Sequence, residues 1–150
     1  MIYHYFKGLG APFLYEVIMR IVVTGGRNFT DKSVIHGCLD FIHFLKPITV
    51  VRHGGAKGVD QICGEWARDN NIIEEVFTPD WDDVTKPDAV IKVSRSGKQY
   101  NAKAGHDRNQ LMLDQIPKPD LCVPFPGGSG TKDMLNRMYK SGIPVYEVIK

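Results

Sequence analysis

The sequence predicts an α/β protein, a Rossmann-like three-layer sandwich built around a mainly parallel sheet. Three observations lead to this fold class. Short β-branched runs alternate along the chain with segments whose apolar residues recur at helical spacing. Glycine pairs stand between a strand-like run and the following helical segment at three places. The 150 residues, 43% of them hydrophobic and 24% charged, suit one domain with a sizeable core.

Nine elements follow one another from residue 20 onward. Five runs rich in Val and Ile are the expected strands, at 20–24, 48–52, 72–77, 120–125 and 143–149. Four segments with apolar residues three and four positions apart are the expected helices, at 31–46, 59–70, 106–116 and 131–142. We expect Thr30 or Asp31 to cap the first helix and Gly142 to end the last. Such alternation predicts parallel strands joined by helices.

Two segments stand apart from this alternation. Residues 1–18 hold five aromatic residues, and we interpret them as an N-terminal extension of a domain that spans 19–150 and folds without it. An insertion at about 83–100 is rich in lysine and arginine and contains a strand-like run at 89–93. Long connections are usually lids or mobile excursions, so we expect either a basic flap over the ligand-binding edge, built as a β-hairpin, or a solvated loop.

Composition and charge exclude several classes of function. A formal net charge of +2 is too small to indicate a broad basic surface, so we do not expect nucleic acid as a partner. No apolar run approaches the ~20 residues that cross a bilayer, and Gly8, Gly10 and Pro12 interrupt any signal-peptide core. Three scattered cysteines suit a reducing compartment, so we expect a cytoplasmic protein. No metal-binding motif occurs, and we expect neither a metal nor a cofactor.

The three glycine pairs share one topological position. Each follows a strand and precedes a helix, which is the carboxyl edge of a parallel sheet, where open α/β sheets bind ligands. Glycine permits close backbone approach, and the next helix offers free N–H groups, so three such loops predict an anion site. The residues expected to contact the ligand there are Gly25, Gly26, Gly54, Gly55, Gly127, Gly128, Ser129, Gly130 and Thr131. Neither the P-loop pattern nor GxGxxG occurs, which disfavours ATP hydrolysis and hydride transfer.

Four side chains near these loops have two interpretations each. Arg27 directly follows a glycine pair and could grip a phosphate or remain solvated. Asp60 could bind a ribose hydroxyl or help cap the second helix. Trp81 could stack on a base or pack over the edge of the sheet. We interpret His53 as a hydrogen-bonded structural histidine rather than an acid or base.

Five segments in this order carry a resemblance to a known family: RIVVTGGRNFTD, RHGGAKGVDQICGEWA, TPDW, AGHDRNQLML and PFPGGSGTKDMLNRMYKSGIPV. They resemble the YspA/YpsA-like branch of the SLOG superfamily, which includes the LOG phosphoribohydrolases and the DNA-processing DprA proteins. The resemblance covers nearly all of residues 20–145. It implies a Rossmann-like fold, a nucleotide or nucleotide derivative as the ligand, and a homodimer. Proteins of this family are common in phages and in nucleotide-signalling conflict systems, so a signalling nucleotide is one candidate.

The resemblance also implies roles for particular residues. In the LOG enzymes a PGGxGTxxE loop holds the phosphate, and its glutamate, with an arginine on a preceding helix, cleaves the N-glycosidic bond. Met134 stands at the glutamate position and cannot assist departure of the base. An enzyme of this type would use Arg108 together with Asp133 or with a residue supplied by the insertion. The matching ligand-binding residues are Gly127, Gly128, Gly130 and Thr131 in the loop and Arg108 and Asn109 in the arginine segment.

Three functions therefore stay open. The preferred one is binding of a phosphorylated nucleotide or nucleotide-derived small molecule. The alternative is hydrolysis of a nucleotide N-glycosidic bond in the manner of a phosphoribohydrolase. A weaker alternative, single-strand DNA binding by analogy with DprA, would require a continuous basic groove with stacking aromatic residues.

Overall fold

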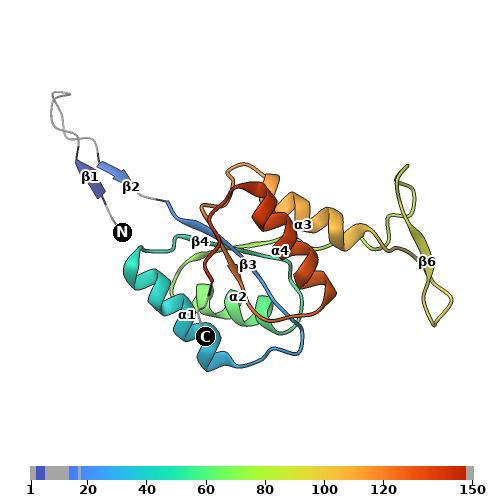
Figure 1. The fold of residues 1–150 in the computed structure, drawn as a ribbon, viewed down its shortest axis with the longest axis horizontal. Helices are drawn as coiled ribbons and strands as arrows, with labels where there is room; N and C mark the ends of the chain where they lie inside the picture. Colours follow the sequence, from blue (N-terminus) through green and yellow to red (C-terminus); the bar gives the residue numbers. More distant parts are fainter. Residues whose placement is uncertain (1–2, 6–13, 17, 148–150) are drawn as a thin grey trace.

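A four-stranded parallel sheet in the order β5-β4-β3-β8 forms the centre of the protein (Figure 1). We analysed a computed structural model, which describes residues 3–5, 14–16 and 18–147. The four strands are β3 (Arg20–Thr24), β4 (Val50–His53), β5 (Ile73–Val76) and β8 (Leu121–Pro124). All three strand pairs are parallel, which confirms the predicted fold class.

Two layers of helices cover the two faces of this sheet. Ile21 and Val23 of β3 point to one face and pack in a core with α1 and α2, whereas Val22 points to the other and packs with α3 and α4. This period of two produces the three-layer sandwich. The helices are α1 (Lys32–Leu45), α2 (Val59–Asp69), α3 (Ala104–Asp114) and α4 (Ser129–Ser141). No helix among the described residues is long and apolar enough to cross a membrane.

The predicted capping residues are confirmed at two helix ends. The Asp31 side chain accepts a hydrogen bond from the Val34 N–H of α1 at 3.1 Å. Gly142 ends α4 with a φ of 75°, the left-handed conformation that favours glycine. Both signals were readable from the sequence because capping depends on a few neighbouring residues.

The predicted last strand at 143–149 is much shorter in the structure. Only Val145 bridges Cys122 of β8, in parallel orientation. The Cys122 N–H donates to the Pro144 carbonyl at 2.8 Å, and the Tyr146 N–H donates to the Cys122 carbonyl at 2.8 Å. Pro144 has no N–H to donate, so the ladder cannot extend through it. Residues 148–150 lie outside the described part of the chain.

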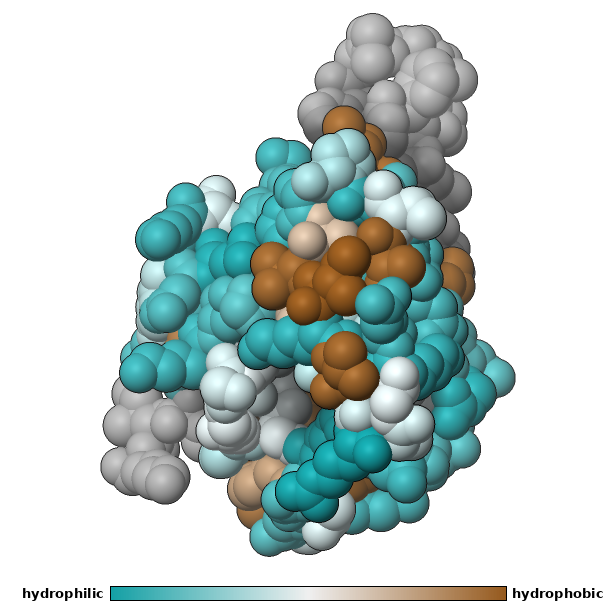
Figure 2. Space-filling model, turned by 90° about the vertical axis from the view of Figure 1, so that its right-hand side faces the viewer, coloured by the Kyte–Doolittle hydropathy of each residue, from teal (hydrophilic) through white to brown (hydrophobic). Residues whose placement is uncertain are grey.

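The two segments outside the alternation each contain a two-stranded antiparallel pair. In the N-terminal extension, β1 (Tyr3–Tyr5) pairs with β2 (Leu14–Glu16), and the remainder of residues 1–17 lies outside the described residues. In the insertion, β6 (Ile91–Val93) pairs with β7 (Gln99–Asn101), so the expected β-hairpin is present. It projects to the right of the sheet in Figure 1. Figure 2 views the molecule from this side and shows apolar side chains at its centre; the exposed apolar residues of the insertion are Val90, Ile91 and Val93.

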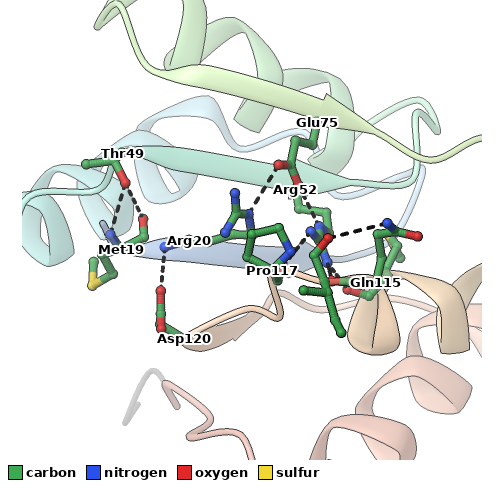
Figure 3. A network of polar contacts seen from close by, with 10 residues as sticks. Met19, Arg20, Thr49, Arg52, Glu75, Gln115, Pro117 and Asp120 are labelled. Carbon is green, nitrogen blue, oxygen red and sulfur yellow. Dashed lines mark hydrogen bonds and ion pairs between the residues drawn. The ribbon is translucent and has the colours of Figure 1, made fainter. Parts of the chain in front are cut away.

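A polar network on the α3–α4 face of the sheet was not predicted. Arg52, only 1% exposed, donates from Nε to Glu75 at 2.7 Å, and Glu75 also accepts from Arg20 at 3.2 Å (Figure 3). The terminal nitrogens of Arg52 donate to the carbonyls of Met112, Gln115 and Pro117 at 2.7, 3.1 and 2.9 Å. These carbonyls belong to the last turn of α3, where a helix leaves acceptors unpaired, and to the segment that directly follows it. Arg52 therefore attaches the end of α3 to the sheet.

Candidate functional site

A cleft of about 700 Å³ opens at the carboxyl edge of the sheet. The loop after β3, the loop after β8 and the start of α3 form most of its walls. The structure places twelve of the predicted site residues in its lining: Gly25, Gly26, Arg27, Asp60, Trp81, Arg108, Asn109, Gly127, Gly128, Ser129, Gly130 and Thr131. Gly54, Gly55 and Asp133 do not line it. Sequence reasoning did not single out Phe29, Ala102 or Gly105, which also line the cleft.

Several loop glycines are required for contacts between the loops themselves. The Gly26 N–H donates to the Pro126 carbonyl at 2.8 Å, which joins the loops after β3 and β8. A Cβ at Gly127 would lie 2.6 Å from the Gly26 nitrogen, and one at Gly58 would lie 2.5 Å from the Gly26 oxygen. A Cβ at Gly25 would meet the Val59 side chain at 2.4 Å. Three glycines, Gly25, Gly58 and Gly127, thus have a packing role that needs no ligand.

Gly128 and Gly130 differ, because a Cβ at either position would meet no atom within 4 Å. Gly128 is the N-cap of α4 and supplies no side-chain cap to the helix. The backbone N–H groups of the first turn, at Ser129, Gly130 and Thr131, have no partner within the helix. The positive end of α4 therefore faces the cleft with free hydrogen-bond donors, as an anion site requires.

Arg108 projects from α3 and is held by backbone carbonyls. Its Nη1 donates to the carbonyls of Gly54 and Phe77 at 2.5 and 3.1 Å, and its Nε donates to the Asn109 side chain at 3.1 Å. A Cβ at Gly54 would lie 2.1 Å from Nη1, so this glycine leaves room for the guanidinium. Burial lowers the pKa of Arg108, as does the charge of Arg27, whereas Asp60 opposes the shift. The two arginines therefore repel each other across one cleft.

Asp60 caps the loop between β4 and α2. Its Oδ2 accepts hydrogen bonds from the N–H groups of Gly54 and Ala56 at 3.2 and 3.1 Å. Burial raises the pKa of Asp60, while the hydrogen bond from Ala56 and the nearby positive groups oppose the rise. The N-cap of α2 is Gly58 and no side chain caps this helix, so the predicted capping of α2 by Asp60 is wrong; its carboxylate holds the preceding loop instead.

His53 and Gly55 have structural roles in the same loop. The Gly55 N–H donates to Nδ1 of His53 at 3.0 Å, so the ring proton lies on Nε2, which donates to Glu74 at 2.7 Å. Both ring nitrogens are thus occupied, which agrees with the interpretation of His53 as structural. Gly55 has a φ of 73°, so its contribution is the turn itself.

Trp81 and the insertion meet the cleft only at its rim. Trp81 is 39% exposed and lies against Gly105, where a Cβ would be 3.0 Å from the ring. The Asn101 N–H donates to the Trp81 carbonyl at 2.8 Å, which fixes the base of the hairpin. Between Trp81 and Ala102 no residue lines the cleft. The insertion therefore does not form the expected flap over the cleft, because its hairpin contributes no residue to the lining.

Asp133 and Met134 both point away from the cleft. Met134 is fully buried in the core between the sheet, α3 and α4. The Asp133 carboxylate accepts hydrogen bonds from Asn109 at 2.9 Å and from Arg137 at 2.8 and 3.2 Å. It lines a separate groove of about 570 Å³ beside α3 and α4. Asn109 thus connects the two places: it lines the cleft, and its side-chain amide donates to Asp133.

Asp133 leads to a prediction about stability at acid pH. Burial alone raises its pKa, but the hydrogen bonds from Arg137 and Asn109 outweigh burial and hold the pKa below its ordinary value of 3.8. A lowered folded-state pKa contributes stability above the unfolded pKa, and this stability is lost as the pH falls through the folded pKa. We expect Asp133→Asn to lose less unfolding free energy than the wild type between roughly pH 5 and pH 3, measured by urea unfolding.

Asp114→Asn, which neutralises an exposed carboxylate at the end of α3, is the control for this measurement. It should follow the pH dependence of the wild type. Parallel curves for Asp133→Asn and the wild type would show that Asp133 does not contribute.

Comparison with known proteins gives three findings. A model of the YspA, cpYpsA-related SLOG family matches residues 19–83. The "Gene 61 protein" of Mycobacterium phage D29 is 31% identical over 134 residues, which cover 84% of this chain and 93% of that protein. The X-ray structure of TM1055, a structural genomics target, is similar with a TM-score of 0.56 and 22% identity, covering 85% of this chain and 72% of that chain. This last likeness shows the fold alone.

The parallel sheet and the glycine-rich loops at its carboxyl edge define a Rossmann-like α/β protein whose fold is of the nucleotide-related kind. The chain belongs to the YspA, cpYpsA-related SLOG family. The resemblance stated from the five sequence segments is thereby confirmed, and the relative from a mycobacteriophage agrees with the occurrence of the family in phages.

Proposed function

We propose that the protein binds a phosphorylated nucleotide or nucleotide derivative in the cleft at the carboxyl edge of the sheet. The observation that carries this proposal is the open first turn of α4, where Gly128 and Gly130 leave space beside free N–H groups. Arg27 and Arg108 line the same cleft and supply positive charge for the phosphate. Trp81 at the rim offers an aromatic face to a base.

Binding without turnover fits the placement of Asp133. A general acid must hold a proton near neutral pH, whereas hydrogen bonds from Arg137 and Asn109 lower the pKa of Asp133. Its carboxylate also lies outside the cleft, and Met134 supplies no proton. These observations favour a binding protein over a phosphoribohydrolase, in which a carboxylate would act on the bound nucleotide.

The test combines thermal shift with measurement of released base. The pure protein is mixed with nucleoside 5′-monophosphates, ADP-ribose and cyclic nucleotides, with the matching unphosphorylated nucleosides as controls. We expect a nucleotide at about 100 times its Kd to stabilise the fold by about 2.7 kcal/mol, without base release. Nucleosides should give a smaller shift because they leave the first turn of α4 empty.

Two outcomes would contradict the proposal. Base release that Asp133→Ala abolishes would favour the phosphoribohydrolase. Absence of any thermal shift at millimolar nucleotide would remove the support for nucleotide binding.

We also propose that the protein is a homodimer in the reducing cytoplasm. The outer face of α1 exposes Phe41, Phe44 and Leu45, with Phe44 84% exposed. Large apolar side chains grouped on one helix face favour contact with a second copy. Burial raises the pKa of Cys38 to about 11 and that of Cys122 to about 12, which keeps both thiols unreactive, as suits cytoplasmic cysteines.

Phe44→Lys tests the dimer. A charge on the outer face of α1 is expected to shift the protein from dimer to monomer, measured by light scattering behind size-exclusion chromatography. Ile116→Lys is the matched control, because Ile116 is 77% exposed and lies outside α1. A wild type that is monomeric at ~100 μM would contradict the dimer, because the dissociation constant of a stable dimer lies far below this concentration.

A further inference from the structure

Asp60 is the one carboxylate among the described residues that line the cleft. Its side chain is buried, with 6% of the residue exposed. Both of its hydrogen bonds, from the N–H groups of Gly54 and Ala56, go to Oδ2. Oδ1 accepts no hydrogen bond from any described residue. The carboxylate is therefore fixed through one oxygen and presents the other as an unused acceptor.

The charge of Asp60 determines what kind of group can approach this oxygen. A phosphate is repelled by a carboxylate and is attracted instead to the first turn of α4, Arg27 and Arg108. Burial penalises the ionised carboxyl, and a hydrogen bond donated to Oδ1 offsets that penalty. Of the groups that a nucleotide carries, Oδ1 therefore fits a hydrogen-bond donor and not the phosphate.

The position of Asp60 in the cleft indicates which donor this is. Gly58, two residues before Asp60, lies against the loop after β3, and this loop contacts the loop after β8 that leads into α4. Asp60 and the first turn of α4 thus line one cleft from different elements. In a nucleotide the uncharged donors beside the phosphate are the ribose hydroxyls, on the sugar that joins the phosphate to the base.

We propose that Asp60 binds a ribose hydroxyl and makes the cleft selective for ribonucleotides over deoxyribonucleotides. This inference rests on the proposed function, because it requires the phosphate to bind at α4. A site that hydrogen-bonds a substrate hydroxyl discriminates against the analogue that lacks it, because the deoxy form offers no donor to Oδ1. A hydrogen bond to a charged group corresponds to an affinity difference of roughly 10- to 100-fold.

The experiment measures the affinity of the full-length protein for the four ribonucleoside 5′-monophosphates and for their 2′-deoxy and 3′-deoxy forms by isothermal titration. We expect the ribonucleotide to bind roughly 10- to 100-fold more tightly than the form that lacks the hydroxyl bound by Asp60. The deoxy form that loses affinity identifies which hydroxyl this is.

Asp60→Asn assigns the selectivity to the residue. Asparagine keeps one oxygen for the N–H groups of Gly54 and Ala56 but turns the negative acceptor into a neutral amide. The ratio of ribonucleotide to deoxyribonucleotide affinity should fall to within about 3-fold of unity, consistent with loss of a charged hydrogen bond. Asp31→Asn, which makes the same change at the N-cap of α1 outside the cleft, should keep the wild-type ratio.

The outcomes separate this inference from the proposed function. Equal affinity of the wild type for ribonucleotides and both deoxy forms overturns the role of Asp60 while nucleotide binding stands. Selectivity that persists in Asp60→Asn assigns it to another residue and overturns the inference as well. Failure of every nucleotide to bind the wild type overturns the proposed function, and the inference with it.

Discussion

Gly128→Gln is expected to abolish nucleotide binding while the fold persists. A Cβ at Gly128 meets no atom within 4 Å, so the new side chain enters open space beside the first turn of α4. There it competes with the phosphate for the position proposed above. Loss of two charge-assisted hydrogen bonds, each worth about 1.5–3 kcal/mol, weakens binding by at least ~100-fold. Isothermal titration with the nucleotide that gives the largest thermal shift measures this effect.

The matched control is Gly37→Gln in α1, another position where a Cβ would meet nothing within 4 Å. This variant should bind nucleotide like the wild type and gain about 0.5–1 kcal/mol of stability, because glycine weakens a helix interior. Gly128→Gln should change the free energy of unfolding by no more than about 1 kcal/mol, since glycine is only one of several good N-cap residues. Undiminished nucleotide affinity in a folded Gly128→Gln protein would show that the phosphate does not bind at the first turn of α4.

Arg52→Met is expected to have the largest effect on stability. The substitution leaves Glu75 without its closest charge partner and leaves the carbonyls at the end of α3 without their donors. The Glu75 side chain is 26% exposed and keeps its bond to Arg20, so most of the loss comes from the carbonyls left without a donor. A buried acceptor left unpaired costs about 1–3 kcal/mol, which predicts a loss of at least about 3 kcal/mol for the three carbonyls together. Urea unfolding monitored by circular dichroism measures the loss.

Arg68→Met is the control for the Arg52 variant. Arg68 also pairs with a strand glutamate, Glu74, but its side chain is 55% exposed. Exposed ion pairs contribute little because water and salt screen them, so this variant should unfold close to the wild type. Similar losses of unfolding free energy in the two variants would show that the burial of Arg52 and its bonds to α3 add no more stability than an exposed ion pair does.

Most of the fold was predictable because the relevant signals are local. A period of two or 3.6 identifies each strand and helix, and the alternation of the two implies a parallel sheet. The last strand was overestimated because Pro144 interrupts its ladder, an effect that propensity alone understates. The insertion was correctly expected to form a hairpin, but its direction depends on how Asn101 and Trp81 meet at its base.

The candidate site was predicted as a place more accurately than as a set of roles. Glycine pairs after three strands located the carboxyl edge correctly. Gly54 proved to make room for Arg108 and Gly127 to make room for Gly26, which are contacts between loops far apart in the sequence. Arg52 gave no signal at all, since an arginine in a strand is usually exposed at one end.

By itself, the sequence determined the order of elements, the family and the edge of the sheet where the glycine-rich loops meet, since each depends on short motifs and on periodicity. Only the tertiary structure decided which glycines face open space, that Met134 and Asp133 turn away from the cleft, and that one oxygen of Asp60 remains free within it. The physical reason is that these properties arise where strands adjacent in space, but distant along the chain, bring their loops together.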